Sequence, residues 1–139
     1  MITAGLTNSF KEELLLGIQD FDTDVIKIAL YTSDAVLGPE TLAYTSLGEV
    51  SGVGYTATGL VLTGVTVTRT NNVAFVSFPN NPTWNAATFT TRGALLYNSS
   101  KSNRSIGVLN FGLDQTMLSQ QFQIQFPPNN AENALIRIS

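Results

Sequence analysis

From residue 25 to the end of the chain, short apolar runs alternate with turn-forming residues, and this pattern restricts the fold more than any other feature. Near the C-terminus, Phe122, Ile124 and Phe126 alternate with glutamines, as in a strand that buries one face. Short runs separated by turn signals are typical of antiparallel sheets. The expected strands cover residues 25–32, 42–45, 59–70, 73–78, 89–97, 105–111, 122–126 and 134–138. We predict a mainly β fold, an antiparallel β-sandwich or barrel-like arrangement of about seven to eight strands.

Two local signals refine this pattern. Between Leu62 and Val65 the alternation changes phase at Gly64, as it does at a β-bulge. Asn71 and Asn72 suit a tight hairpin turn, because asparagine tolerates positive φ better than most residues that carry a side chain. No linker or change of composition marks a second domain, so we expect one domain over residues 1–139.

Only the N-terminal part of the chain shows helical periodicity. Ser9 and Glu12 have the spacing of a capping box, in which each side chain satisfies the backbone of the first turn. The apolar stripe consists of Phe10, Leu14, Leu15, Ile18 and Phe21, and the residues outside it are Lys11, Glu12, Glu13 and Gln19. We predict one amphipathic helix near residues 9–20 that covers an end or a face of a sheet. An arm that binds a partner is the alternative.

The chain contains neither histidine nor cysteine. Histidine is the side chain best placed for proton transfer near neutral pH, and the two residue types together supply most zinc sites. Their absence excludes a Ser-His-Asp triad, a thiol nucleophile, a zinc finger and a disulfide. A small hydrolase with two carboxylates stays open as an alternative, although no local pattern supports it. We predict a protein that is not an enzyme and needs no metal or cofactor.

Charged residues make up 12% of the chain, about half the usual share. Most of the polar surface must therefore come from 17 threonines, 12 asparagines and 11 serines. This composition fits an ordinary β domain, and it also fits a surface that packs against neighbours, because interface cores are depleted in charge. The net charge of −3 and the scattered cations argue against nucleic acid as a partner.

No apolar run approaches the length of a membrane-spanning helix. The N-terminus lacks the basic and apolar regions of a secretory signal. We therefore expect no membrane partner and assembly in a reducing cytoplasm.

Three segments resemble ligand sites in part. Asp20, Asp22 and Asp24 have the spacing that opens a calcium loop, but the glycine and glutamate which an EF-hand needs further on are missing. A solvated turn is the favoured interpretation, and a looser calcium site is the alternative. Residues 48–59 are rich in glycine but lack the ending of a phosphate-binding loop. They suit a mobile loop or hairpin that lies on a neighbour. Trp84 either closes one end of the core, which we favour, or stacks on a sugar.

One motif occurs twice. Phe78-Pro79-x-Asn81 returns 48 residues later as Phe126-Pro127-x-Asn129, and each copy is followed by Asn-Ala at the same distance. Two related halves packed with pseudo-symmetry would produce this echo. Two strands that leave a sheet through similar turns would produce it too, and we favour the second explanation.

Several segments resemble a family of small virion structural proteins of tailed bacteriophages. The matching stretches are Ile28-Ala29-Leu30-Tyr31-Thr32, Glu49-Val50-Ser51-Gly52-x-Gly54-Tyr55, Leu62-Thr63-Gly64-Val65, Trp84-x-x-Ala87-Thr88-Phe89, Arg92-Gly93-Ala94-Leu95-x-Tyr97-Asn98 and Val108-Leu109-x-Phe111-Gly112. The resemblance covers most of the chain and brings no catalytic residues with it. It implies a structural part of the particle, namely a capsid decoration (cement) protein located on the virion. A tail or adaptor component and a carbohydrate-binding module are the alternatives.

Such a role implies contact with the major capsid protein or other virion proteins, in several copies. We expect a homo-oligomer on the particle, with a closed trimer as the first expectation. The contacts are expected in a projecting arm of residues 1–8 and in the glycine-rich loop 48–59. The expected contact residues are Ile2, Leu6, Val50, Val53, Tyr55 and Trp84.

Overall fold

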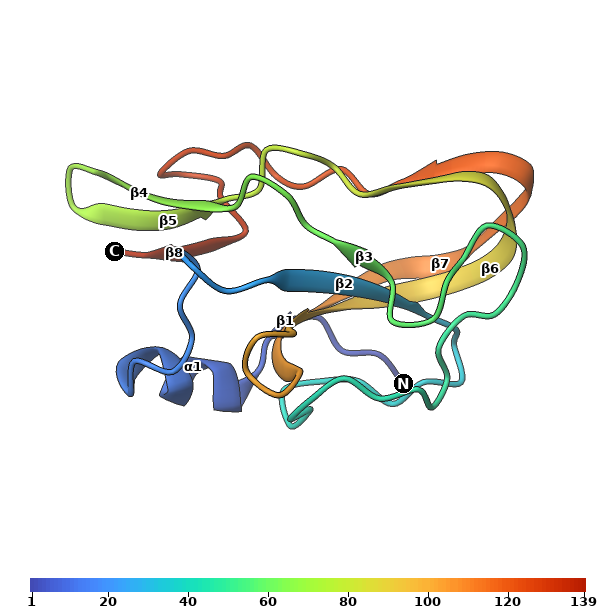
Figure 1. Cartoon of the computed structure of the whole chain (residues 1–139), viewed down its shortest axis with the longest axis horizontal. Helices are drawn as coiled ribbons and strands as arrows, with labels where there is room; N and C mark the ends of the chain where they lie inside the picture. The colour runs from blue at the N-terminus through green and yellow to red at the C-terminus, as the bar shows by residue number, and fades with distance from the viewer.

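The computed structural model describes residues 1–139 and contains one helix and two antiparallel sheets. The elements are β1 (Gly5–Leu6), α1 (Asn8–Leu15), β2 (Ile26–Tyr31), β3 (Leu60–Val61), β4 (Thr66–Thr70), β5 (Val73–Ser77), β6 (Thr83–Asn98), β7 (Arg104–Gln123) and β8 (Ile136–Ile138). The larger sheet has the order β1-β7-β6-β2-β3, and the small sheet has the order β4-β5-β8. The prediction of a mainly β, antiparallel fold with one helix is confirmed. Neither sheet closes into a barrel, since each ends in two edge strands (Figure 1).

The long β6–β7 ribbon forms the frame of the molecule. Its strands pair from Asn98 and Arg104 at the hairpin end to Thr83 and Gln123 at the far end, with several register shifts between. Figure 1 shows the ribbon bending back over β2, so that its two halves lie in different layers. A register shift next to Gly93 and a positive φ of 80° at Gly112 accompany this bend. The predicted strands 89–97 and 105–111 are therefore only parts of two much longer strands. The predicted strand 122–126 is wrong, because its first two residues end β7 and residues 124–126 lie in no strand.

Both faces of the central strands are buried. On one face, Ile28 and Leu30 of β2 belong to a core of 18 buried residues that also includes Val76 and Ile136 of the small sheet. On the other face, Tyr31 belongs to a second cluster of 8 buried residues. The N-terminal segment and the loop after β2 contribute to this second cluster. Burial on both faces explains the nearly continuous apolar run of β2.

The helix is shorter than predicted and begins one residue earlier. Its N-cap is Thr7, whose hydroxyl accepts a hydrogen bond from the Phe10 amide at 3.4 Å. The predicted cap, Ser9, instead lies with its hydroxyl 3.4 Å from that of Ser105. The helix ends at Leu15, shortly before Gly17 adopts a φ of 74°. The prediction of a helix over 9–20 with a Ser9 cap is therefore wrong at both ends.

Two predicted strands differ from the structure for identifiable reasons. Residues 59–70 divide into β3 and β4, because Gly64, with a φ of 72°, marks the point where the chain passes from one sheet to the other. The phase change is thus a change of sheet and not a bulge within one strand. Residues 42–45 form no strand and contribute a single bridge between Ala43 and Arg104. The hairpin turn at Asn71 is confirmed, with a φ of 54° between β4 and β5.

The two copies of the repeated motif lie against each other. The Asn129 side chain bonds to both the N–H and the C=O of Phe78, at 2.9 and 3.1 Å. In the reverse direction, the Asn81 side chain accepts from the Phe126 amide at 3.2 Å. The rings of Phe78 and Phe126 are 5.2 Å apart. Each asparagine therefore stabilises the backbone of the other copy. Two similar turns alone would not require such reciprocal contacts.

Candidate functional site

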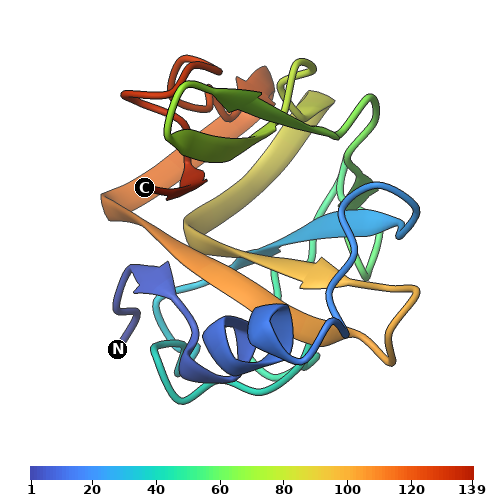
Figure 2. The ribbon, with the colours of Figure 1, turned by 90° about the vertical axis from the view of Figure 1, so that its left-hand side faces the viewer.

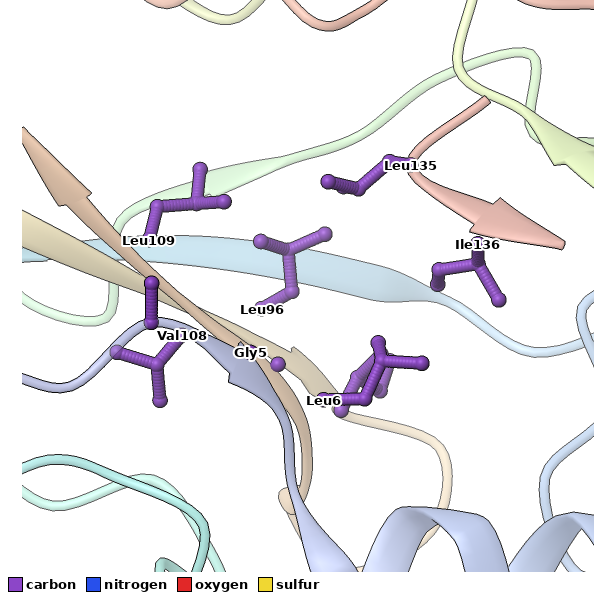
Figure 3. A pocket seen from close by; sticks show the side chains of 10 residues that line it. Gly5, Leu6, Leu96, Val108, Leu109, Leu135 and Ile136 are labelled. Carbon is purple, nitrogen blue, oxygen red and sulfur yellow. The ribbon is translucent and has the colours of Figure 1, made fainter. Parts of the chain in front are cut away.

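An apolar hollow lies where both ends of the chain meet β7. Its volume is about 270 Å3, and its lining residues are Ala4, Gly5, Leu6, Leu96, Ile106, Gly107, Val108, Leu109, Leu135 and Ile136. Figure 3 shows these side chains converging from β1, β6, β7 and the chain around the start of β8. None of the lining side chains is polar. The hollow therefore suits an apolar group and offers no acid, base or nucleophile to a substrate.

The principal polar cluster surrounds the carboxylate of Glu49. One carboxylate oxygen accepts a hydrogen bond from the Tyr44 hydroxyl at 2.6 Å. The other accepts from the Tyr55 hydroxyl at 2.5 Å and from the Thr58 amide at 2.8 Å. The Tyr55 oxygen in turn accepts from the backbone N–H of Leu30 in β2 at 3.1 Å. Glu49 thus connects both ends of the glycine-rich loop to the central sheet.

Two further tyrosines complete this group, which we call the Glu49 cluster: Tyr31, Tyr44, Glu49, Tyr55 and Tyr97. Tyr31 donates to the Thr45 carbonyl at 2.7 Å, and Tyr97 donates to the Thr58 carbonyl at 2.6 Å. Burial and the hydrogen bond to Glu49 raise the pKa of Tyr44 and Tyr55 well above the ordinary value. Burial also raises the pKa of Tyr31 and Tyr97. These phenols stay protonated near neutral pH and act as fixed hydrogen-bond donors.

The glycines of the loop allow it to lie directly on the sheet. A Cβ atom at Gly59, whose φ is 81°, would come within 1.8 Å of the Ile28 carbonyl oxygen. A Cβ atom at Gly52 would come within 2.6 Å of the Thr88 carbonyl oxygen. Val53 forms a bridge with Thr88 of β6. These glycines therefore permit close packing of the loop within the chain, a role that the prediction of a mobile loop or hairpin did not include.

The segment with calcium-loop spacing, residues 20–24, is an internally bonded turn. Asp20 accepts hydrogen bonds from the Asp22 amide and the Thr23 hydroxyl. Asp24 forms an ion pair with Lys101 at 2.8 Å and accepts from Asn98 at 2.7 Å. Burial raises the pKa of the Asp24 carboxyl, but the hydrogen bonds from Lys101 and Asn98 outweigh it and hold that pKa below its usual value. The three carboxylates do not converge on one point, and the structure contains no cluster of three metal-ligating side chains.

A series of hydrogen-bonded polar side chains next to α1 was not predicted from the sequence. Arg104 donates to Glu13 at 2.8 Å, Gln19 donates to the other Glu13 oxygen at 2.9 Å, and Asn98 donates to Gln19 at 2.9 Å. Glu13 and Gln19 are both buried. Their polar side chains placed them outside the apolar stripe, and no local signal reveals partners that lie about 80–90 residues away along the chain.

The structure places most of the expected contact residues inside the fold. Ile2, Val50 and Trp84 are 7%, 4% and 3% exposed. Leu6 and Tyr55 are partly buried, and Val53 stands out at 68% exposed. Buried side chains cannot make contacts with a partner unless the fold changes. Among the six, Val53 is therefore the most exposed side chain.

The N-terminal segment lies on the fold and does not project from it. The terminal ammonium group bonds to the Ala35 carbonyl at 3.1 Å, and the Thr3 amide bonds to the Leu37 carbonyl at 2.8 Å. The Asn110 side chain donates to the Ile2 carbonyl at 2.9 Å. Residues 1–8 are thus part of the fold: β1 joins the larger sheet, Thr7 caps α1 and Asn8 begins it.

Comparisons with known proteins give no relative: no family model, no curated protein and no solved structure matches this chain. None of its helices has the length and apolar character needed to span a membrane.

Proposed function

We propose that this protein is a non-enzymatic structural component of a tailed-bacteriophage virion: a capsid decoration (cement) protein that binds and stabilises the shell of major capsid protein. In this proposal it acts in several copies on the particle, after assembly in the host cytoplasm. No catalytic group, cofactor or nucleic acid takes part.

The observation that carries the proposal is the division of side chains between interior and exterior. Several of the few charged groups are held in internal contacts, among them Glu13, Asp24 and Glu49. Large aliphatic side chains are exposed instead, namely Met1, Leu15, Leu16, Val25, Val36, Leu42, Leu47, Val53, Val61, Val67, Leu113, Leu118 and Ile138. A surface poor in charge and rich in aliphatic groups loses little hydration free energy on contact with another protein.

The segments of the family resemblance lie side by side. Ile28–Thr32 belongs largely to β2, which pairs with the part of β6 that contains Arg92–Asn98. The glycine-rich stretch lies over both strands through Glu49 and Val53. In this chain these segments belong to the scaffold of the fold, which suits a structural role. We further propose that the two layers form a β-sandwich, because side chains of both sheets meet in one core.

The alternatives differ in what they require of the surface. A carbohydrate-binding module needs an exposed aromatic face, and the proposed platform, Trp84, is only 3% exposed. A tail or adaptor component would use the same kind of surface as a decoration protein. The distinction between head and tail therefore rests on where the protein binds.

The test is binding to particles of the encoding phage that were prepared without this protein. We expect saturable binding to the shell, seen by co-sedimentation and as regularly placed density in electron cryomicroscopy. Binding to tails alone would support the tail alternative, and binding to neither would reject a virion role. Val53→Asp and Leu47→Asp are suitable surface variants, since both side chains are exposed and their substitution leaves the core intact. Deletion of residues 1–8 is unsuitable, because it would damage the fold.

A further inference from the structure

The end of the molecule that carries α1 and the small sheet contains an apolar groove. This end groove has a volume of about 340 Å3. One lip consists of Leu14, Phe21 and the aspartate turn, and the other consists of the face of the small sheet that includes Val67 and Ile138. Figure 2 looks onto this end, with α1 below and the small sheet above.

Two exposed leucines follow Leu14, a lining residue of the groove, in the chain. Leu15 and Leu16 follow Leu14 at the end of α1 and are 92% and 64% exposed. On the opposite lip, Val67 and Ile138 are 54% and 60% exposed. This end of the molecule therefore carries both exposed apolar side chains and an apolar groove.

The two lips carry charges of opposite sign, and none of these charges belongs to an ion pair within the chain. Asp20 and Asp22 line the first lip. On the second lip, Arg137 lines the groove, and Arg69 pairs in register with Ala74, a lining residue, and so lies on the same sheet face. The three ion pairs of the chain are Arg92–Asp114, Lys101–Asp24 and Arg104–Glu13. Arg69 thus lies across the groove from two aspartates that, like it, form no ion pair, whereas the Arg137 guanidinium donates to the Ala131 carbonyl at 3.3 Å.

We propose that the end groove binds a second copy of this chain around a two-fold axis. In a two-fold interface each surface meets an identical one, so a patch must be complementary to itself. Here the acidic lip of one protomer faces the basic lip of the other, and its Leu15–Leu16 projection enters the partner's groove. The inference is independent of the proposed virion role, since it concerns association of the purified protein.

The first test measures the mass of the free protein by sedimentation equilibrium between about 1 and 300 μM, a range that spans weak and moderate affinities. A concentration-dependent dimer is expected. A monomer over the whole range, or a trimer, would overturn the proposal.

The second test uses charge reversal across the lips. Asp22→Lys and Arg69→Glu each place like charges opposite one another twice in a homodimer, and we expect each to weaken association by about tenfold or more. Both side chains are exposed, and the Asp22 carboxylate accepts no hydrogen bond in the structure, so folding should persist in both variants. An unchanged circular-dichroism spectrum checks this.

Mixing the two variants gives the decisive result. In the mixed dimer, the lysine introduced by Asp22→Lys in one protomer faces the glutamate introduced by Arg69→Glu in the other, and the second contact keeps its native pair. An equimolar mixture should therefore associate as the wild type does. Val36→Asp serves as the control, because Val36 is 83% exposed and does not line the groove. Wild-type association of both single variants, failure of the mixture to associate, or loss of association in the Val36→Asp control would each overturn the proposed interface.

Discussion

Glu49 shows how one carboxylate holds a segment that would otherwise have little to stabilise it. Its two oxygens accept three hydrogen bonds from Tyr44, Tyr55 and Thr58, all within the same loop region. Hydrogen bonds to a charged acceptor are stronger than those between neutral groups. The loop is thereby fixed on the sheet without any regular secondary structure of its own.

Replacement of Glu49 by alanine should be destabilising, because it leaves two partly buried phenols and one amide without their acceptor. We expect a loss of about 2 kcal/mol or more in the free energy of unfolding, measured by urea denaturation. Glu132→Ala is the matched control, since the Glu132 side chain is exposed and its substitution should change stability by less than about 0.5 kcal/mol. Equal effects of the two substitutions would contradict the anchoring role.

Asp24 makes stability depend on pH in the acid range. Its pKa in the folded chain lies below the usual value of 3.8, which the unfolded chain retains. A carboxyl whose pKa is lowered by folding contributes stability above the unfolded pKa and loses it as the pH falls through the folded one. We expect the urea midpoint of the wild type to fall between pH 5 and pH 2 by more than that of Asp24→Asn. Parallel curves for the two proteins would show that the ion pair with Lys101 contributes nothing.

At the scale of elements, the structure depends on close contact between the glycine-rich loop and the two central strands. Gly59 lies so near the Ile28 carbonyl that no side chain fits there. Gly17, after the helix, has a similar φ of 74°, but a Cβ atom added there would have no neighbouring atom within 4 Å. Substitution of Gly17 by alanine therefore tests the cost of the positive φ alone. The same substitution at Gly59 adds the cost of steric overlap with β2.

Gly59→Ala should destabilise the chain by more than about 3 kcal/mol, since it adds a clash to the strain of a positive φ. Gly17→Ala should cost about 1–2 kcal/mol from strain alone. Thermal unfolding followed by circular dichroism distinguishes the two values. If both variants melted at the same temperature, the loop would have to lie further from β2 than the structure shows.

The sequence predicts those elements best whose signals are local. The β4–β5 hairpin follows from Asn71 and Asn72, and β2 follows from its apolar run. The helix boundaries were wrong because Thr7 is held as a cap by distant residues, with its hydroxyl 2.9 Å from that of Ser105. The polar alternation in the distal half of β7, where Met117 is buried between exposed neighbours, hides a strand that continues to Gln123.

The candidate site was even less predictable. Val50, Tyr55 and Trp84 lie close in sequence to glycines or prolines and resemble surface residues, yet they face the core. Their burial depends on the bend that brings the β6–β7 ribbon back over β2. No local sequence pattern predicts this bend. The end groove also consists of residues from four separate parts of the chain: 14, 19–22, 67–76 and 136–138.

At the scale of the whole molecule, both termini contribute to the fold. The N-terminal residues pack against the loop after β2 and against β7, and Ile2 belongs to the second buried cluster. β8 completes the small sheet through its pairing with β5. A short strand near each terminus, β1 or β8, thus pairs with a longer strand of one of the two sheets.

Removal of residues 1–4 should therefore lower the melting temperature by about 5–10 °C, because burial of an isoleucine side chain contributes about 1.5–3 kcal/mol. Differential scanning calorimetry provides the measurement. Deletion of Ser139, which is exposed and follows β8, is the control and should leave the transition unchanged. An unaltered transition after removal of residues 1–4 would instead indicate a free arm.

The partners of the N-terminal segment also determine when it can fold during synthesis. Gly5 and Leu6 pair with Val108 and Gly107, and the helix cap at Thr7 bonds to Ser105, 98 positions later. The partner residues Ser105, Gly107 and Val108 leave the ribosome only when most of the chain has been made. Until then, β1 and α1 lack these partners. Contacts between such distant positions slow folding and prolong the exposure of apolar segments to other chains. The first elements to be synthesised are therefore among the last to become ordered.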